Sequence, residues 1–268
     1  EEIKETSVLE SLKNIITNRP LLAVILANFF NSFKSVGGSS ESYFWLNNTG
    51  SLLNQTICGL FTGIPNYIMV PIAAKMVKKW GARATSIIAG LFGFFAYMTL
   101  FFVGFHPFGQ TFKDHYIFNL IWVIFGLTIC GLPNKILNVS GQIVTAEALD
   151  YMEWKHGLRN EALVTTVQGY FGKLATSVTG WLSGMVLTWI NYVPLTDSLG
   201  NAVPQTDPTM LNGIWAVFCI LPALARGLYG VSFIIYPIHG DLQQQMIVEL
   251  AEKRAQRLAE QEAKDHQA

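Results

Sequence analysis

The sequence predicts an all-α membrane protein folded as a bundle of six transmembrane helices. Hydrophobic residues make up 51% of the 268 residues and charged residues only 13%, against roughly a quarter charged in soluble domains. The mean hydropathy is +0.34. Six apolar stretches reach the roughly 20 residues that a helix needs to cross a bilayer. Together these observations favour the membrane class over any soluble fold.

The six predicted spans follow one another with short connections. They cover residues 21–45, 52–74, 85–105, 116–144, 162–190 and 211–238. Segment 191–209 is rich in Pro, Gly, Asn and Asp, which predicts an irregular loop. Residues after Gly240 are good helix formers with mixed charges, so we expect a solvated helix there, capped by Asp241. The expected organisation is a lead-in at 1–19, a six-helix bundle at 20–240 and a helical tail at 241–268.

The positive residues outside the spans predict the orientation of the chain. Lys and Arg collect in cytoplasmic loops of membrane proteins. Here one side carries nearly all of them, whereas the opposite loops contain only Lys113. We therefore expect a multi-pass protein of the inner (plasma) membrane, with the lead-in and the tail both cytoplasmic. The residues on that side are Lys4, Lys13, Arg19, Lys75, Lys78, Lys79, Arg83, Lys155, Arg159, Lys253, Arg254, Arg257 and Lys264.

Composition also argues against several classes of function. The formal net charge is zero, so nothing in it favours nucleic-acid binding. Cys58, Cys130 and Cys219 stand singly inside apolar runs, which is typical of buried thiols rather than of metal ligands. No nucleophile stands beside a base in the spans, so we expect neither an enzyme nor a metal site or cofactor.

Charged residues inside the spans are the strongest functional signal. A charge at the centre of a bilayer costs about 2.5–3.5 kcal/mol on insertion scales, so such residues usually face a partner or a water-filled cavity. In the first span Lys34 and Glu41 lie on one helical face with Asn31, and Gly37 and Gly38 between them permit a kink. We expect Lys34 and Glu41 to face substrate; the alternative is a polar helix contact with Lys34 reaching toward the interface. Further charges in the spans are Lys135, Lys173 and Arg226.

The fifth span carries a polar stripe at helical spacing. It places Lys173 on the same face as Thr166, Tyr170 and Ser177, so we expect this face to point inward and to bind substrate or couple a cation. A structural ion pair is the alternative for Lys173. In the fourth span Asn138 and Gln142 offer the amide hydrogen bonds that a sugar site uses.

Three motifs resemble the glycoside-pentoside-hexuronide:cation symporter family, the melibiose-permease-like sugar transporters of the major facilitator superfamily. The first is D-Y-x-E-W-K-x-G-x-R-x-E at 150–161; the others are N-R-P-L-L at 18–22 and P-I-A-A-K-M-V-K-K-W-G at 71–81. The resemblance implies the carboxyl-terminal half of such a transporter, a six-helix bundle that works by alternating access with an amino-terminal half. That other half would bind most of the coupling Na⁺ or H⁺. Lys173 lies twelve residues beyond Glu161, as in the family.

The charged motif itself lies outside the predicted membrane core. We expect its charged residues to form a cytoplasmic gate by pairing with the other half of the transporter: Asp150, Glu153, Lys155, Arg159 and Glu161. Two other readings remain, namely a six-helix scaffold that acts alone and a homodimeric transporter or channel subunit. The sugar, the coupling cation and the oligomeric state stay open, as does whether the chain is a fragment or a separately encoded half.

Overall fold

Long helices account for nearly all of the regular structure. The computed structural model describes residues 18–157 and 161–265. Its helices are α2 (Arg19–Ser32), α3 (Lys34–Ser39), α4 (Glu41–Asn47), α5 (Leu53–Val103), α6 (Tyr116–His156), α7 (Glu161–Trp189), α8 (Pro208–Ser232), the 3₁₀ turn η1 (Phe233–Ile235) and α9 (Asp241–Asp265). Two short strands, β1 (Leu195–Thr196) and β2 (Ala202–Val203), complete the regular structure.

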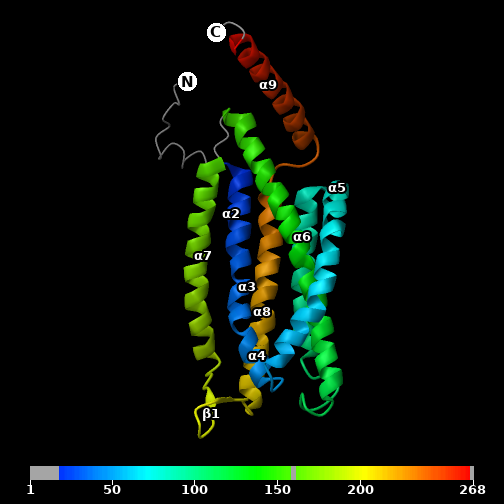
Figure 1. The fold of residues 1–268 in the computed structure, drawn as a ribbon, viewed down its shortest axis with the longest axis vertical. Helices are drawn as coiled ribbons and strands as arrows, with labels where there is room; N and C mark the ends of the chain where they lie inside the picture. The colour runs from blue at the N-terminus through cyan, green and yellow to red at the C-terminus, as the bar shows by residue number, and fades with distance from the viewer. Residues whose placement is uncertain (1–17, 158–160, 266–268) are drawn as a thin grey trace.

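The helices run nearly side by side (Figure 1). Helix α7 forms one edge, α2–α4 and α8 occupy the middle, and the two arms of α5 pack with α6 along the other edge. Helix α9 projects beyond one end of the bundle and the β1–β2 hairpin lies at the opposite end. We call these the α9 end and the hairpin end.

The predicted fold class is confirmed, and all six predicted spans are helical. Within the described residues, four stretches are long and apolar enough to cross a membrane: Arg19–Asn47, Leu53–Val103, Tyr116–Lys155 and Pro208–Ile235. The second of these contains two of the predicted spans, because α5 turns back on itself. Helix α7 lies outside this set, since its polar stripe lowers its hydropathy.

The first span is a discontinuous helix. Asn18 caps α2 by accepting a hydrogen bond from the backbone N–H of Leu21 at 3.2 Å, which starts the helix just before Pro20. The helix is then interrupted at Phe33 and again at Ser40, on either side of α3. Both residues keep helical dihedrals, with φ −64° and ψ −18° at Phe33 and φ −83° and ψ −6° at Ser40, so the kink that Gly37 and Gly38 permit stays a prediction.

Helix α5 reverses at Gly81. This glycine has φ of +79°, a backbone conformation that other residues rarely adopt. The segment after Ala74, expected to be a loop between two spans, is instead helical on both sides of Gly81, since its alanines and lysines are good helix formers. Beyond the turn, Arg83 donates from Nε to the carbonyl of Phe233 at 3.0 Å and from Nη2 to that of Ile234 at 2.9 Å. It thus attaches the segment after the turn to η1, which follows α8.

Two further connections contain regular structure. Helix α6 continues past Val144 to His156 and ends at Gly157, whose φ is +70°, so the first part of the charged motif is helical rather than a loop. Segment 191–209 is not fully irregular, because β1 and β2 pair antiparallel. The carboxylate of Asp197 accepts the backbone N–H groups of Leu199 and Asn201 and closes the turn between the strands.

The buried apolar side chains form two main clusters, one toward each end of the bundle. The hairpin-end cluster is aromatic; in it the rings of Phe44 and Phe218 stack with centroids 4.8 Å apart. Its members include Phe44, Trp45, Phe105, Phe112, Val123, Trp215 and Phe218. The α9-end cluster is richer in aliphatic residues and includes Leu21, Val24, Ile136, Val144, Tyr229, Tyr236 and Met246. The helices that link the two clusters are α2–α4, α5, α6 and α8.

Helices α5 and α8 cross in close contact at a pair of glycines. A Cβ atom on Gly90 would lie 2.7 Å from the Cα of Gly230 and 2.8 Å from the carbonyl oxygen of Arg226. Both atoms belong to the backbone, so no side-chain rotation can relieve the overlap. Small residues at such crossings let membrane helices approach closely.

Replacing Gly90 by Val should therefore force α5 and α8 apart. We expect a destabilisation of about 1–3 kcal/mol, typical of overpacking, seen as a lower melting temperature of the purified protein in detergent. Gly63→Val is the matched control on the same helix, because a Cβ at Gly63 meets nothing within 4 Å. Equal melting temperatures for the two variants would contradict the close crossing.

Candidate functional site

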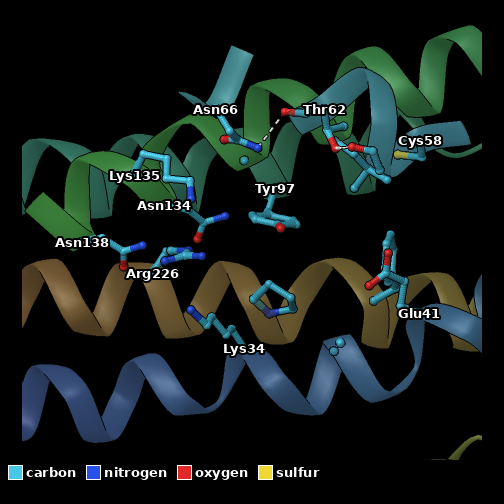
Figure 2. Close-up of a pocket in the computed structure, with 17 residues that line it drawn as sticks. Lys34, Glu41, Cys58, Thr62, Asn66, Tyr97, Asn134, Lys135, Asn138 and Arg226 are labelled. Carbon is cyan, nitrogen blue, oxygen red and sulfur yellow. Dashed lines mark hydrogen bonds between the residues drawn. The ribbon is translucent and has the colours of Figure 1, made fainter. Parts of the chain in front are cut away.

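A cavity of about 410 Å³ lies between the two apolar clusters. Its walls come from α3, α4, α5, α6 and α8 (Figure 2). The volume falls within the range of small-molecule sites, roughly 300–1,000 Å³. A discontinuous helix beside a cavity near mid-membrane is an arrangement that transporters use to bind substrate.

Three of the predicted site residues line this cavity together. Lys34 begins α3, Glu41 begins α4 and Asn138 comes from α6. Figure 2 shows Lys34 and Glu41 from the discontinuous helix and Asn138 on the facing α6. The indole Nε1–H of Trp45 donates to a Glu41 carboxylate oxygen at 3.4 Å, a distance at the long limit of such bonds.

The cavity also contains polar residues of the spans for which no role was predicted. Lys135 and Arg226 stand out in the sequence as charges within spans, and that signal alone could have placed them here. The amides of Asn66 and Asn134 carry the same signal as Asn138 and Gln142, a polar amide within an apolar span. Polar Asn residues occur at many helix contacts, so their convergence on one cavity depends on how α5 and α6 pack. All of these residues line the cavity.

Arg226 is the most buried of the charged residues in the cavity. Only 3% of its surface is exposed. Its Nη1 donates to Oδ1 of Asn31 at 3.1 Å, whereas its Nε–H has no acceptor. Across the cavity, the Nζ of Lys135 lies 5.1 Å from the ring centroid of Tyr67, a cation–π distance. Within the described part of the chain, neither Lys34, Lys135 nor Arg226 forms an ion pair.

Two amide oxygens at this cavity also lack hydrogen-bond donors. Asn66 donates from Nδ2 to the carbonyl of Thr62 at 2.8 Å, but its Oδ1 and that of Asn134 are buried without a partner. Buried polar atoms are almost always hydrogen-bonded. A cavity with several free donors and acceptors is therefore suited to a ligand with many hydroxyl groups.

A second cavity of about 460 Å³ lies between α2, α6 and α8, toward the α9 end. It is lined by uncharged groups, among them Asn28, Asn31, Gln142 and the ring of Tyr229. Asn138 lines both cavities. The predicted residues Asn138 and Gln142 are thus brought together here. The hydrogen bond from Arg226 to Asn31 joins the wall of the first cavity to the wall of the second.

The predicted residues on α7 are not brought to either cavity. Lys173, Thr166, Tyr170 and Ser177 are exposed on the described chain. Helix α7 packs on α2 and α3 and buries its opposite face. Lys173 therefore lines neither cavity of the described chain, and its expected role in a substrate or coupling pathway stays a prediction, while mostly small and β-branched residues form the buried face of α7. The buried residues are Val164, Val167, Ala175, Thr179 and Val186.

The charged motif contacts α9 of the same chain. The Nη2 of Arg254 lies 2.8 Å from an Asp150 carboxylate oxygen and 2.6 Å from one of Glu153, and Arg257 lies 3.2 Å from Glu153. Hydrogen bonds to these carboxylates raise the pKa of Arg254. Asp150 and Glu153 thus form ion pairs within the described chain, and their expected pairing with another half of a transporter stays a prediction. Arg159 lies outside the described residues.

Further contacts attach α9 along its length. The indole Nε1–H of Trp154 donates to Glu249 at 2.7 Å, and hydrogen bonds from Gln245 and Trp154 hold the pKa of Glu249 below its ordinary value. Met246 and Leu250 are buried, so the docking face of α9 is not solvated as expected. The other members of the predicted gate lie close by, with Lys155 Nζ 5.8 Å from the ring centroid of Tyr151 and Glu161 at the start of α7.

Comparison with known proteins places this geometry in a family. Residues 1–240 match the family described as MFS/sugar transport protein. The chain belongs to this sugar transport family. The predicted resemblance to cation-linked sugar symporters is thereby confirmed, and the chain is an integral membrane protein.

Three relatives illustrate the similarity. The chain is 30% identical to an uncharacterized symporter of Bacillus subtilis, YjmB, over 93% of this chain and 50% of the relative. It is 22% identical to an isoprimeverose transporter of Lactiplantibacillus pentosus, over 94% of this chain and 49% of the relative. It is also 22% identical to a glucuronide carrier protein homolog of Escherichia coli, over 94% of this chain and 51% of the relative. The chain thus spans about half the length of these members of the sugar transport family.

Glu153 anchors α9, so Glu153→Gln should release that helix. The substitution removes the charge that Arg254 and Arg257 share, and we expect trypsin to cleave after these arginines at least about threefold faster, since cleavage follows local opening. The initial cleavage rate is measured by mass spectrometry. Glu252→Gln is the control, because Glu252 is exposed on the same helix. Unchanged cleavage of the Glu153 variant would show that other contacts hold α9.

Proposed function

We propose that this chain is the carboxyl-terminal half of a cation-coupled sugar or glycoside symporter that works by alternating access with an amino-terminal six-helix half. Its length, about half that of its relatives, supports this assignment. The coupling ion is Na⁺ or H⁺, bound mainly by the other half. The alternatives, a scaffold or a homodimeric transporter or channel subunit, are not favoured by any feature of the described chain.

One observation carries the proposal. The cavity beside the discontinuous first span gathers Lys34, Glu41 and Asn138 with the unpartnered amide oxygens of Asn66 and Asn134. A sugar presents hydroxyl groups that both donate and accept hydrogen bonds, so it would satisfy these groups. Transporters of this general type bind substrate near the bilayer midplane, where two halves meet around discontinuous helices.

The exposed polar face of α7 supports the need for a second half. Lys173, Thr166, Tyr170 and Ser177 would be costly facing lipid, so we place this face against the amino-terminal half and its water-filled pathway. In this arrangement Lys173 serves as a substrate or coupling residue. The distribution of Lys and Arg favours an orientation in the plasma membrane with α9 in the cytoplasm, where the charged motif would act as a gate contact.

The proposal is tested by transport with both halves present. The chain, co-expressed with its amino-terminal half and reconstituted into vesicles, should accumulate a radiolabelled sugar when an inward Na⁺ or H⁺ gradient is imposed. The chain alone should not. Transport by the chain alone would instead support the homodimeric alternative, and no uptake of any sugar by the stable two-half complex would overturn the proposal.

Replacing Lys173 by Ala in the same complex should impair gradient-driven accumulation. The reason is that a charge at membrane depth is retained where a partner or a polar pathway uses it, and we expect at least about a tenfold loss of accumulation. Lys113→Ala, an exposed loop position, serves as the control. Normal concentrative uptake by the Lys173 variant, at equal expression, would exclude a role in coupling.

A further inference from the structure

Another cavity, of about 320 Å³, lies at the α9 end between two glycine turns. The first turn is Gly81 in α5 and the second is Gly240 just before α9, with φ of +79° and +57°. Figure 1 shows the turn of α5 and the linker into α9 at the same end of the bundle. A Cβ atom on either glycine would meet nothing within 4 Å, so open space adjoins both turns.

The walls of this cavity carry a guanidinium and no carboxylate. Arg83 and His239 line it together with Gln243 and the ring of Trp80, and none of its described lining residues is acidic. Arg83 uses two of its five N–H donors on carbonyls of η1. Its other donors have no acceptor in the described part of the chain. Glu147, the carboxylate bound to this wall, is engaged with Gln243, whose Nε2 donates to it at 2.7 Å.

A run of lysines leads into the cavity along α5. Three of them precede the turn and are exposed: Lys75, Lys78 and Lys79. The Nζ of Lys79 lies 5.7 Å from the ring centroid of Trp80. Within the described part of the chain, neither these lysines nor Arg83 forms an ion pair. Asp241, exposed at the start of α9, is the acidic residue that follows the lining segment, so positive charge predominates around the cavity.

The surface beside the cavity is apolar on both neighbouring helices. Every exposed residue at 82–97 of α5 and at 224–235 of α8 and η1 has an apolar side chain. The two helices cross at Gly90 and Gly230, so these side chains form one band. They are Ile88, Leu91, Phe92, Phe95, Leu224, Leu228, Val231, Ile234 and Ile235.

This apolar band differs from the exposed face of α7. The face of α7 is polar, and we place it against the amino-terminal half. An apolar band needs no such partner and suits the hydrocarbon of the bilayer. The cavity therefore lies where a surface suited to lipid meets a run of lysines, on a side that the other half is not expected to cover.

From this arrangement we infer that the cavity binds the headgroup of an anionic phospholipid. Arg83 contacts the phosphodiester, because a guanidinium presents paired N–H donors that match phosphate oxygens. Lysines near a membrane surface attract anionic lipid, and Trp is favoured at the level of the headgroups. The acyl chains lie along the apolar band. The inference depends on the embedding of the chain in a membrane and not on the proposed transport of sugar.

The test compares two phospholipids that differ in headgroup charge. The chain is purified in detergent in complex with its amino-terminal half, freed of native lipid, and mixed with dioleoylphosphatidylglycerol or dioleoylphosphatidylcholine. Native mass spectrometry measures the bound lipid. We expect the first phosphatidylglycerol to bind at least about fivefold more tightly than phosphatidylcholine, the effect of one cation near the membrane surface. Equal affinities would overturn the inference.

Arg83→Gln should remove this preference. We expect the affinity for phosphatidylglycerol to fall at least about fivefold, while that for phosphatidylcholine changes less than about twofold. Arg19→Gln is the matched control, because Arg19 is an exposed cation at the same end of the bundle, on α2. No loss in the Arg83 variant, or an equal loss in both variants, would show that general surface charge attracts the lipid and would overturn the site.

A second variant keeps the inference testable if Arg83→Gln fails to fold, since that change also removes two hydrogen bonds to η1. Size-exclusion chromatography checks this. The double variant Lys79→Gln, Trp80→Leu alters only exposed side chains and should weaken phosphatidylglycerol binding at least about threefold. Unchanged binding by the folded double variant would contradict the inference.

Soluble phosphates distinguish a lipid site from a site for a free anion. Inorganic phosphate and glycerol 3-phosphate are added at millimolar concentration in competition with phosphatidylglycerol, with sodium chloride of equal ionic strength as the control. We expect neither to displace the lipid beyond the effect of sodium chloride, because both lack the acyl chains that contact the apolar band. Specific displacement by either would assign the cavity to a soluble phosphate and exclude the lipid.

Discussion

The cost of holding charge away from water shapes this bundle more than any single contact. Lys34, Lys135 and Arg226 lie within predicted membrane spans, where a bilayer would disfavour their charges, and an apolar cluster packs on either side of them. The helices must therefore enclose a polar cavity. Close crossings such as Gly90 on Gly230 keep the enclosing helices together. Stability and function thus depend on the same geometry.

Hydropathy and charge were enough to predict the helices and part of the site. Lys34, Glu41 and Asn138 were expected from their rarity or polarity within apolar runs, and they do share one cavity. The polar stripe on α7 is also present, on a face that is exposed in the described chain. A periodic pattern shows which residues share one face of a helix. The structure adds that the face with Val167 and Ala175 is the buried one. Which face is buried depends on tertiary packing, and the periodic pattern does not specify it.

Connections were predicted less well, for a related reason. A charged segment reads as a loop when only hydropathy is considered, yet Asp150 and Glu153 continue α6, and Arg254 and Arg257 on α9 balance them. The acidic residues of α6 and the arginines of α9 lie about a hundred residues apart in the sequence, so local sequence patterns do not show that they pair. The partly exposed pairs contribute little individually, but together with buried Met246 and Leu250 they fix α9 to the end of α6. The family motif is therefore also an intramolecular docking surface.

The two breaks in the first span have a mechanical consequence. Helix α2 is anchored in one apolar cluster and α4 in the other, while α3 lies between the breaks at Phe33 and Ser40. The segment therefore consists of three short helices joined at Phe33 and Ser40, where backbone hydrogen bonds reach three residues back instead of four. A bend at either position would change the separation of Lys34 and Glu41, which belong to different helices, while both ends stay packed in their clusters. The spacing of opposite charges in the cavity thus depends on the curvature of a single segment.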